Sequence, residues 1–133
     1  MRLLSMLSMA MMLAVSPVTA QGPPLEFEDR DSLEVWARSS PAGGRLYPLG
    51  PEELGFYCAD RSYTSGILSS ELAVYVKTGV DDVHKLVLYL PLKDFVQRRA
   101  EMQDETLIIE ERSFDESEGT VQMTVPLRML SGF

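Results

Sequence analysis

The pattern of apolar and polar residues predicts four β-strands in the second half of this 133-residue chain. They are residues 71–78, 84–90, 106–114 and 120–127. Both faces of the second strand are apolar, which is typical of a central strand that is covered on two sides. Pro126 fits an edge strand or a strand end better than a central position, so it marks the last strand as an edge candidate.

Shorter patterns predict two more strands in the first half of the chain. Residues 25–28 alternate and form a short strand candidate, and residues 56–59 are an apolar run that predicts a buried strand. Residues 60–66 and 79–82 carry turn signals between the strands. Residues 115–119 are expected to form an acidic turn between the last two strands.

Two segments are candidates for a helix. Pro91 is expected to end the strand before it, and residues 93–102 then fit a short amphipathic helix. Its inner stripe would be formed by Leu92, Phe95, Val96, Arg99 and Met102. Residues 31–37 begin with a capping-box pattern at 31–34 and predict a helix, although a strand over 33–38 fits equally well.

Residues 39–55 form the longest stretch without a regular pattern. Proline and glycine are dense in it, which predicts consecutive turns, and long loops of this kind often carry function. Together the segments predict a small single α+β domain, mainly antiparallel sheet with one short helix. An all-β sandwich is the alternative, because one short helix decides between the two classes.

The first twenty residues have the pattern of a cleavable secretory signal. Met1 and Arg2 precede an apolar run over residues 3–15, Ser16 and Pro17 break it, and small or β-branched residues precede Gln21, the expected new N-terminus. The run is shorter than the roughly 20 apolar residues that span a bilayer. The sequence therefore predicts an exported protein whose single domain covers residues 21–133, without a stable membrane anchor after cleavage.

Composition narrows the class of partner and the compartment. The chain has 12 basic and 20 acidic residues and a net charge of −8, which argues against nucleic acid and anionic membrane surfaces as partners. Arg outnumbers Lys by 9 to 3 and Asn is absent, a bias that GC-rich codons produce. This favours a bacterial protein that is periplasmic or secreted. Cys58 is the only cysteine, so no disulfide within the chain stabilises the domain.

No motif in the chain identifies a catalytic, metal or nucleotide site. Cys58 and His84 are one candidate pair, for a thiol nucleophile and its base. A serine-rich region, with Ser62, Ser65, Ser69 and Ser70, lacks the Gly-x-Ser-x-Gly pattern of a nucleophile elbow. Acidic groups at Asp81–Asp82 beside His84, and at Asp115, Glu116 and Glu118, lack the ligand spacing of zinc or calcium sites. We therefore expect neither metal nor cofactor, and the lack of a catalytic motif favours a role other than that of an enzyme.

Aromatic residues in the turn-rich first half are the candidate binding residues. They are Trp36, Tyr47, Phe56, Tyr57 and Tyr63, which could form a binding platform or fill the core. The leading hypothesis is a periplasmic interaction protein, an assembly factor, inhibitor or accessory subunit that binds another envelope protein, with the edge near 120–127 able to accept a partner strand. The alternatives are a small-ligand or carbohydrate-binding module and a hydrolase or thiol enzyme that uses Cys58.

Overall fold

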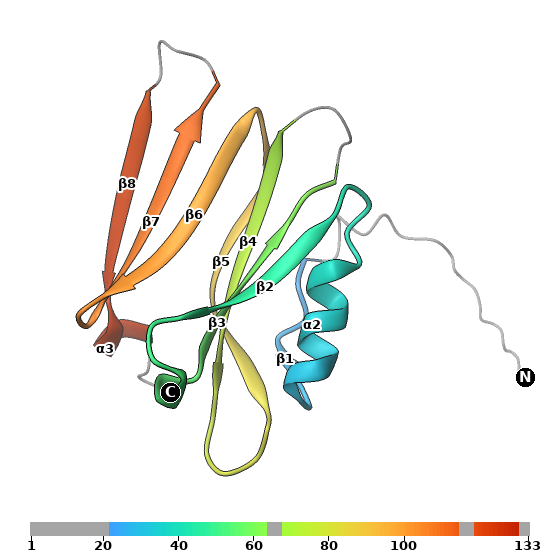
Figure 1. Ribbon diagram of the computed structural model, residues 1–133, viewed down its shortest axis with the longest axis vertical. Helices are drawn as coiled ribbons and strands as arrows, with labels where there is room; N and C mark the ends of the chain where they lie inside the picture. Colours follow the sequence, from blue (N-terminus) through green and yellow to red (C-terminus); the bar gives the residue numbers. More distant parts are fainter. Residues whose placement is uncertain (1–21, 64–67, 115–118, 131–133) are drawn as a thin grey trace, which may run out of the picture.

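Eight strands form two antiparallel sheets in the computed structural model, which describes residues 22–63, 68–114 and 119–130 (Figure 1). The larger sheet has the strand order β1 (Glu26–Phe27), β5 (His84–Asp94), β4 (Ser69–Lys77), β3 (Phe56–Arg61) and β2 (Gly44–Leu49). The smaller sheet has the order β6 (Val96–Gln103), β7 (Thr106–Ser113) and β8 (Thr120–Pro126). The described helices are α2 (Arg30–Arg38), a 3₁₀ turn η3 (Glu52–Leu54) and α3 (Leu127–Leu130). None of them is long and apolar enough to cross a membrane.

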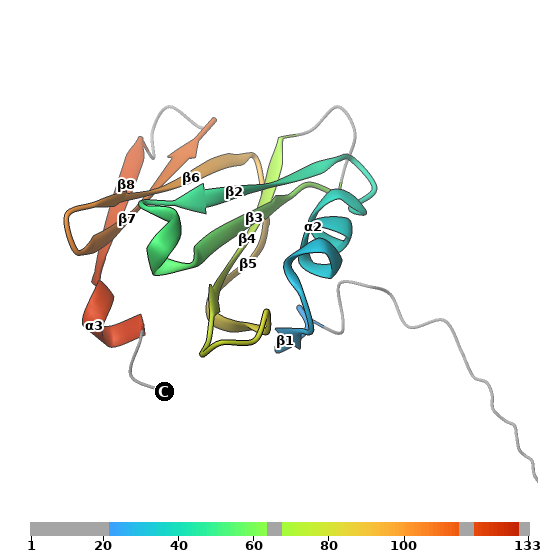
Figure 2. The same cartoon turned by 60° about the horizontal axis from the view of Figure 1, so that its bottom comes forward.

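Helix α2 covers one face of the larger sheet (Figure 2). Leu33 and Ala37 of the helix are fully buried against Ala59, Ala73 and Tyr75 of the sheet. Three alanines in this contact, Ala37, Ala59 and Ala73, let the helix approach the strands closely. The burial of this apolar stripe, rather than intrinsic propensity, is what stabilises a helix of only nine residues.

The helix alternative for residues 31–37 is confirmed, and the strand alternative for 33–38 is wrong. The capping residue is Asp29, two positions before the predicted box. Its backbone is extended, with φ −153°, and its carboxylate accepts a hydrogen bond from the Ser32 N–H at 2.7 Å. That interaction satisfies one of the N–H groups that the first helical turn leaves without a partner.

The opposite face of the larger sheet packs against the smaller sheet and forms the main core. Strand β4 is at its centre and is buried on both faces, with Leu72, Val74 and Val76 toward the smaller sheet. Leu107 and Ile109 of β7 meet them from the other side. The short helix α3 follows β8 and brings its own buried leucine, at position 130, into the same core.

The predicted helix at 93–102 is wrong, because this segment forms the end of β5 and the whole of β6. Strand β5 continues through Pro91 to Asp94, and Phe95 turns the chain into the second sheet with a positive φ of 63°. Val96, Arg98 and Ala100 then alternate inward along β6. The residues fit a helical stripe and a strand almost equally, and pairing with β7 decides for the strand.

The stretch 39–55 is not a run of turns, because it contains β2 and the 3₁₀ turn. Strand β2 pairs with β3 over its full length. Gly44 has no room for a side chain, since an added Cβ would lie 2.0 Å from the Ala37 carbonyl oxygen. Glycine in this stretch therefore does not only mark turns, because Gly44 is required by the close packing against α2.

The coarser fold prediction is confirmed: the domain is small and mostly antiparallel sheet, with one helix of more than four residues in its described part. The strands expected at 25–28, 56–59, 71–78, 84–90, 106–114 and 120–127 all occur, with ends that differ by up to four residues. The strand at 84–90 is next to the edge rather than at the centre, because only the two-residue strand β1 follows it in the sheet. The predicted signal peptide and most of the acidic turn at 115–119 lie outside the described residues.

Candidate functional site

Strand β8 has a neighbouring strand on one side only, within the described part of the chain. It is the last strand of the smaller sheet and lies at the border of the molecule, at the left of Figure 1. A strand in this position presents a row of backbone donors and acceptors to solvent. The sequence predicted an edge position for this strand from Pro126, and the strand order confirms it.

The register shows which backbone groups of β8 point outward. The Ser113 N–H donates to the Gly119 carbonyl at 3.2 Å, and the Leu127 N–H donates to the Glu105 carbonyl at 2.8 Å. Because alternate pairs in an antiparallel ladder exchange hydrogen bonds, the odd-numbered residues of β8 bond to β7. The even-numbered residues direct their N–H groups to the free edge, and these are Thr120, Gln122 and Thr124.

Two other edge strands, β2 and β6, carry features that discourage pairing with another chain. Pro48 lies within β2 and has no N–H to offer along that edge. On β6, Arg99 and Glu101 place charges on the strand. The Ala100 N–H at its edge already donates to the Tyr47 hydroxyl of β2, at 3.1 Å. Charges, proline and occupied donors are the usual protection of natural edge strands.

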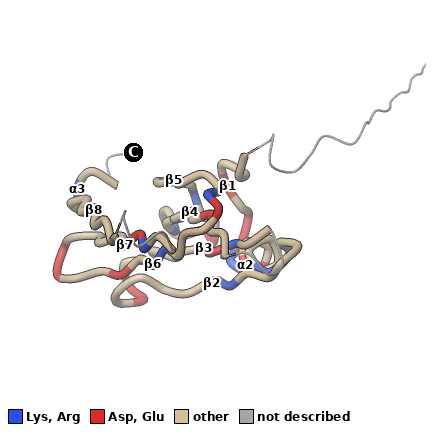
Figure 3. Tube along the Cα trace, turned by 90° about the horizontal axis from the view of Figure 1, so that it is seen from above, with Lys and Arg blue, Asp and Glu red and all other residues tan. Residues whose placement is uncertain are grey.

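Strand β8 carries none of these features before its last residue. Its sequence, Thr-Val-Gln-Met-Thr-Val-Pro, contains no charged side chain, and its proline comes at the end. The β8 trace is accordingly tan in Figure 3, where charged residues are red or blue. Among the edge strands β2, β6 and β8, β8 is therefore the least protected against pairing with another chain.

The inward face of β8 is only partly covered. Met123 and Val125 are half-buried and pack against the core between the sheets. Val121 lies on the same face but is 52% exposed. The apolar row along β8 therefore continues beyond the region that the larger sheet covers.

A second apolar surface lies at the end of the molecule where β5 turns into β6. Leu68, Phe95 and Phe114 are each about half exposed, and their backbones are in contact. The Phe95 N–H donates to the Leu68 carbonyl at 2.6 Å, and the Phe114 N–H donates to the Phe95 carbonyl at 3.0 Å. Phe95 has a positive φ of 63°, a conformation that is costly for a residue with a side chain.

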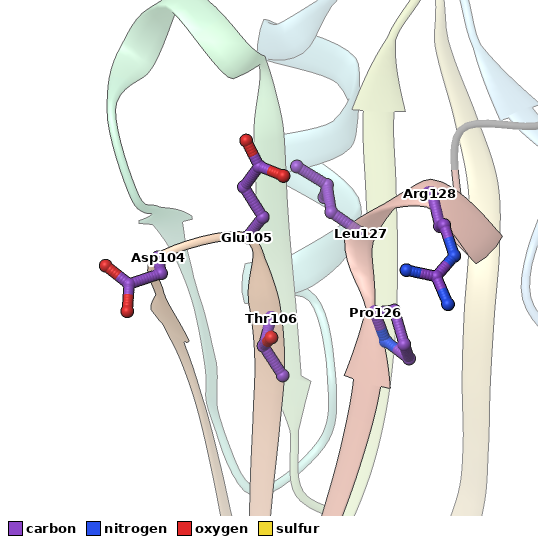
Figure 4. A pocket seen from close by; sticks show the side chains of 6 residues that line it. All are labelled: Asp104, Glu105, Thr106, Pro126, Leu127 and Arg128. Carbon is purple, nitrogen blue, oxygen red and sulfur yellow. The ribbon is translucent and has the colours of Figure 1, made fainter.

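An open cavity of about 710 Å³ lies at the opposite end of β8 (Figure 4). It is lined by the turn between β6 and β7 and by the start of α3. Figure 4 shows Asp104 and Arg128 on opposite sides of it, with Glu105 and Leu127 between them. Its mixture of charged and apolar groups makes it an extension of the β8 surface rather than an enclosed ligand pocket.

The five aromatic residues predicted as a platform are divided between the two faces of the larger sheet. Tyr47 and Phe56 face the core between the sheets, so they are structural. Trp36 and Tyr57 lie on the α2 side, where Tyr57 contacts the His84 ring with centroids 5.5 Å apart. This arrangement does not bring all five into one platform, and the core-filling alternative fits Tyr47 and Phe56.

Trp36 and Tyr63 do come together, around a buried ion pair. The Arg61 guanidinium lies 4.1 Å from the Trp36 ring centroid and donates to Glu71 Oε1 at 3.1 Å. The hydroxyls of Tyr63 and Tyr89 donate to the same carboxylate. Arg61 and Glu71 are each less than 5% exposed, so among the described residues this cluster fills the space under α2. Burial raises the pKa of Tyr63 to about 12.

Cys58 and His84 do not form a dyad. Cys58 is fully buried in the core between the sheets, whereas His84 lies on the α2 side with Tyr57. Burial raises the pKa of the Cys58 thiol to about 12, so almost no thiolate is present at neutral pH. The Nδ1 of His84 is engaged with the Asp82 carbonyl at 2.7 Å.

The serine and acidic candidates have structural roles or lie outside the described residues. The Ser62 hydroxyl donates to the Ser69 carbonyl at 2.9 Å, and the Ser69 hydroxyl accepts from the Tyr63 N–H at 3.3 Å. Within the described ranges, no three His, Cys, Asp or Glu side chains are placed to hold a metal ion, which excludes the site considered at residues 81–84. Ser65 and the acidic residues 115, 116 and 118 are not among the described residues.

Sequence reasoning found β8 but missed a cavity lined by arginines where the two sheets meet. The available signal was the alternation of Val96, Arg98, Ala100 and Met102, which a helical interpretation concealed.

No protein-family model, curated protein sequence or solved structure matches the chain. The described residues form two sheets in which β8 is an edge strand without interior proline or charge, and the function is argued from that geometry.

Proposed function

We propose that this chain is an exported protein-interaction module that binds an extended segment of another envelope protein as an added strand along β8. The observation that carries the proposal is the unprotected edge: three outward N–H groups on a strand without charge or interior proline. Strand addition supplies affinity through main-chain hydrogen bonds, and neighbouring side-chain positions supply specificity.

The chemistry of β8 specifies the segment it would accept. An added strand places every second side chain on the inward side, next to the apolar row of Val121, Met123 and Val125. An alternating segment with apolar residues on that side would cover Val121, which is 52% exposed. Because the chain carries a net charge of −8, basic residues flanking the segment would favour encounter.

Export is part of the same proposal and rests on the signal-like residues 1–20. The acidic, arginine-rich composition supports the bacterial periplasm as the compartment. The interaction role is preferred over a thiol enzyme because Cys58 is buried with a raised pKa. It is preferred over a small-ligand module because the five candidate aromatic residues are divided between two faces.

The test compares three baits made from residues 21–133: the wild type, Gln122→Ala and Gln122→Pro. Gln122→Ala removes the side chain and keeps the outward N–H, whereas Gln122→Pro removes the N–H from the free edge and leaves the β7 ladder intact. Each bait is incubated with envelope extract of the source organism, and bound proteins are quantified by mass spectrometry.

The proposal expects one protein that the wild type and Gln122→Ala capture at similar yield and that Gln122→Pro loses. Identical capture by all three baits, or no stoichiometric protein with any of them, would contradict it. Light scattering on the purified baits covers the remaining possibility: a wild-type dimer that Gln122→Pro converts to a monomer would show that β8 pairs with a second copy instead of a different partner.

A further inference from the structure

Four of the nine arginines of the chain line one cavity of about 260 Å³ where the two sheets meet. Arg45 comes from β2, Arg98 and Arg99 come from β6, and Arg112 comes from β7. Two carboxylates, Asp60 and Glu110, lie in the same wall. In a chain with 20 acidic and 12 basic residues, this is a local reversal of charge.

Arg98 forms the fixed part of the cavity. Its side chain is 8% exposed, and its donors are directed at the Ser70 carbonyl at 2.9 Å, the Pro91 carbonyl at 2.7 Å and the Glu111 carboxylate at 3.1 Å. These interactions connect β6 to the larger sheet and hold the cavity wall in place. The buried Ser70 hydroxyl interacts with the Asp60 carboxylate of the same wall, and this interaction favours the charged form of Asp60.

Arg45 and Arg99 are held loosely and keep donors for a ligand, although Arg99 also lies 3.8 Å from a second carboxylate, that of Glu101. The Nε of Arg45 is 3.8 Å from Asp60, and the Nη2 of Arg99 is 3.8 Å from Glu110, both longer than a direct hydrogen bond. Both side chains are about two-thirds exposed. A guanidinium has five N–H donors, so ion pairs of this length leave most of them unused.

We propose that this cavity binds a small, doubly charged oxyanion, either a phosphate group or a dicarboxylate. The fork of donors on arginine matches the paired oxygens of both groups. The volume of about 260 Å³ is large enough for such a group. An adjoining cavity of about 340 Å³ shares Arg45 and Asp60 and gives room for the remainder of a larger molecule.

Isothermal titration calorimetry of the mature chain with inorganic phosphate and, separately, with succinate tests the site. The double variant Arg45→Gln/Arg112→Gln removes two exposed guanidinium groups and leaves the buried Arg98 in place. The matched control is Arg128→Gln, an exposed arginine on a different cavity. Thermal unfolding of each protein establishes that it is folded, and Arg99→Gln provides a second variant if the double variant is not.

The proposal expects saturable binding of at least one of the two anions and a loss of about tenfold or more in the double variant, because charge-assisted hydrogen bonds are the strong ones. Arg128→Gln should bind like the wild type. The anion that binds identifies the source of the charge, phosphate or carboxylate. No binding of either anion at millimolar concentration, or equal weakening by Arg128→Gln, would overturn the proposal. Gln122→Pro should not alter anion binding, so failure here is separable from failure of strand addition at β8.

Discussion

The space under α2 and the outer edge of β8 are built in opposite ways. Under the helix, Leu33, Ala37 and Tyr75 are fully buried, and even the charged Arg61 and Glu71 have partners inside the protein. Along β8 no strand of the described residues pairs with the outward N–H groups, and Val121 is half exposed. The first region is completed within the chain, whereas the second would be completed by another molecule.

The difference matters because the chain protects its other long edges. Pro48 interrupts the donors of β2, and the Tyr47 hydroxyl occupies a donor at the edge of β6. Because the chain protects its other long edges, the unprotected edge of β8 is best explained by the proposed binding of another chain there. Substitutions in the closed region should therefore affect stability, and substitutions at the open edge should affect binding.

The largest effect is expected from Glu71→Ala, which leaves the Arg61 guanidinium buried without its carboxylate. Breaking a buried pair in this way costs about 3–5 kcal/mol of folding free energy. Urea unfolding measures the loss. The double variant Glu71→Met/Arg61→Met removes both charges and should lose less than Glu71→Ala alone. An equal loss would show that the ion pair is not what makes the single substitution costly.

Proline substitutions at neighbouring positions of β8 should differ in cost. Met123→Pro removes an N–H that bonds to β7, so it should cost about 1–3 kcal/mol more than Met123→Ala. Gln122→Pro removes an outward N–H and should cost less than about 1 kcal/mol more than Gln122→Ala. Chemical denaturation of the four proteins measures both differences. Equal costs at the two positions would mean that the outward N–H groups have been assigned to the wrong residues.

A charge at the exposed end of the apolar row should separate stability from binding. Val121→Lys places an ammonium group at a site that is 52% exposed, so the stability should change by no more than about 0.5 kcal/mol. Capture of the partner should be lost, because the charge would be desolvated by an added strand. Thermal unfolding and the bait experiment are the two measurements. Undiminished capture would place the partner away from β8.

The smallest effect concerns the start of α2 and depends on pH. Hydrogen bonds from Ser32 lower the pKa of Asp29 below its ordinary value of 3.8. The stabilisation by the carboxylate is therefore complete above pH 3.8 and is lost as the pH falls through the lowered value in the folded protein. Asp29→Asn should remove this part of the pH dependence while keeping a cap acceptor. Unfolding curves across the acid range measure it, and an unchanged pH profile would contradict the assignment.

The sequence predicted most strands because residues two positions apart share a face, a period that a strand explains and a helix does not. Residues 71–78 and 120–127 are clear cases, and Pro126 even indicated an edge. The segment 93–102 failed because its residues suit a helix as well, and the sharp turn at Phe95 has no sequence signal. In residues 39–55, the glycines and prolines obscured β2. Pro48 is compatible with this edge strand because no neighbouring strand of the described residues would pair with an N–H at that position.

The candidate site was less predictable than the fold. Aromatic composition pointed to Trp36 and Tyr63, but their partner Arg61 and their closure under α2 depend on which strands are neighbours. The openness of β8 likewise follows from strand order, because only the absence of a further strand makes its uncharged sequence an accessible surface. Pairing order arises from contacts distant in sequence, which local patterns do not encode.

The central claim is that β8 presents free backbone donors, and residue-resolved amide hydrogen exchange of the free protein by NMR tests it most directly. The account predicts rapid exchange for the outward N–H groups of Gln122 and Thr124. It predicts protection for Met123 and Val125, which bond to β7. Protection of Gln122 and Thr124 equal to that of their neighbours would show that the edge is already occupied and would contradict the account.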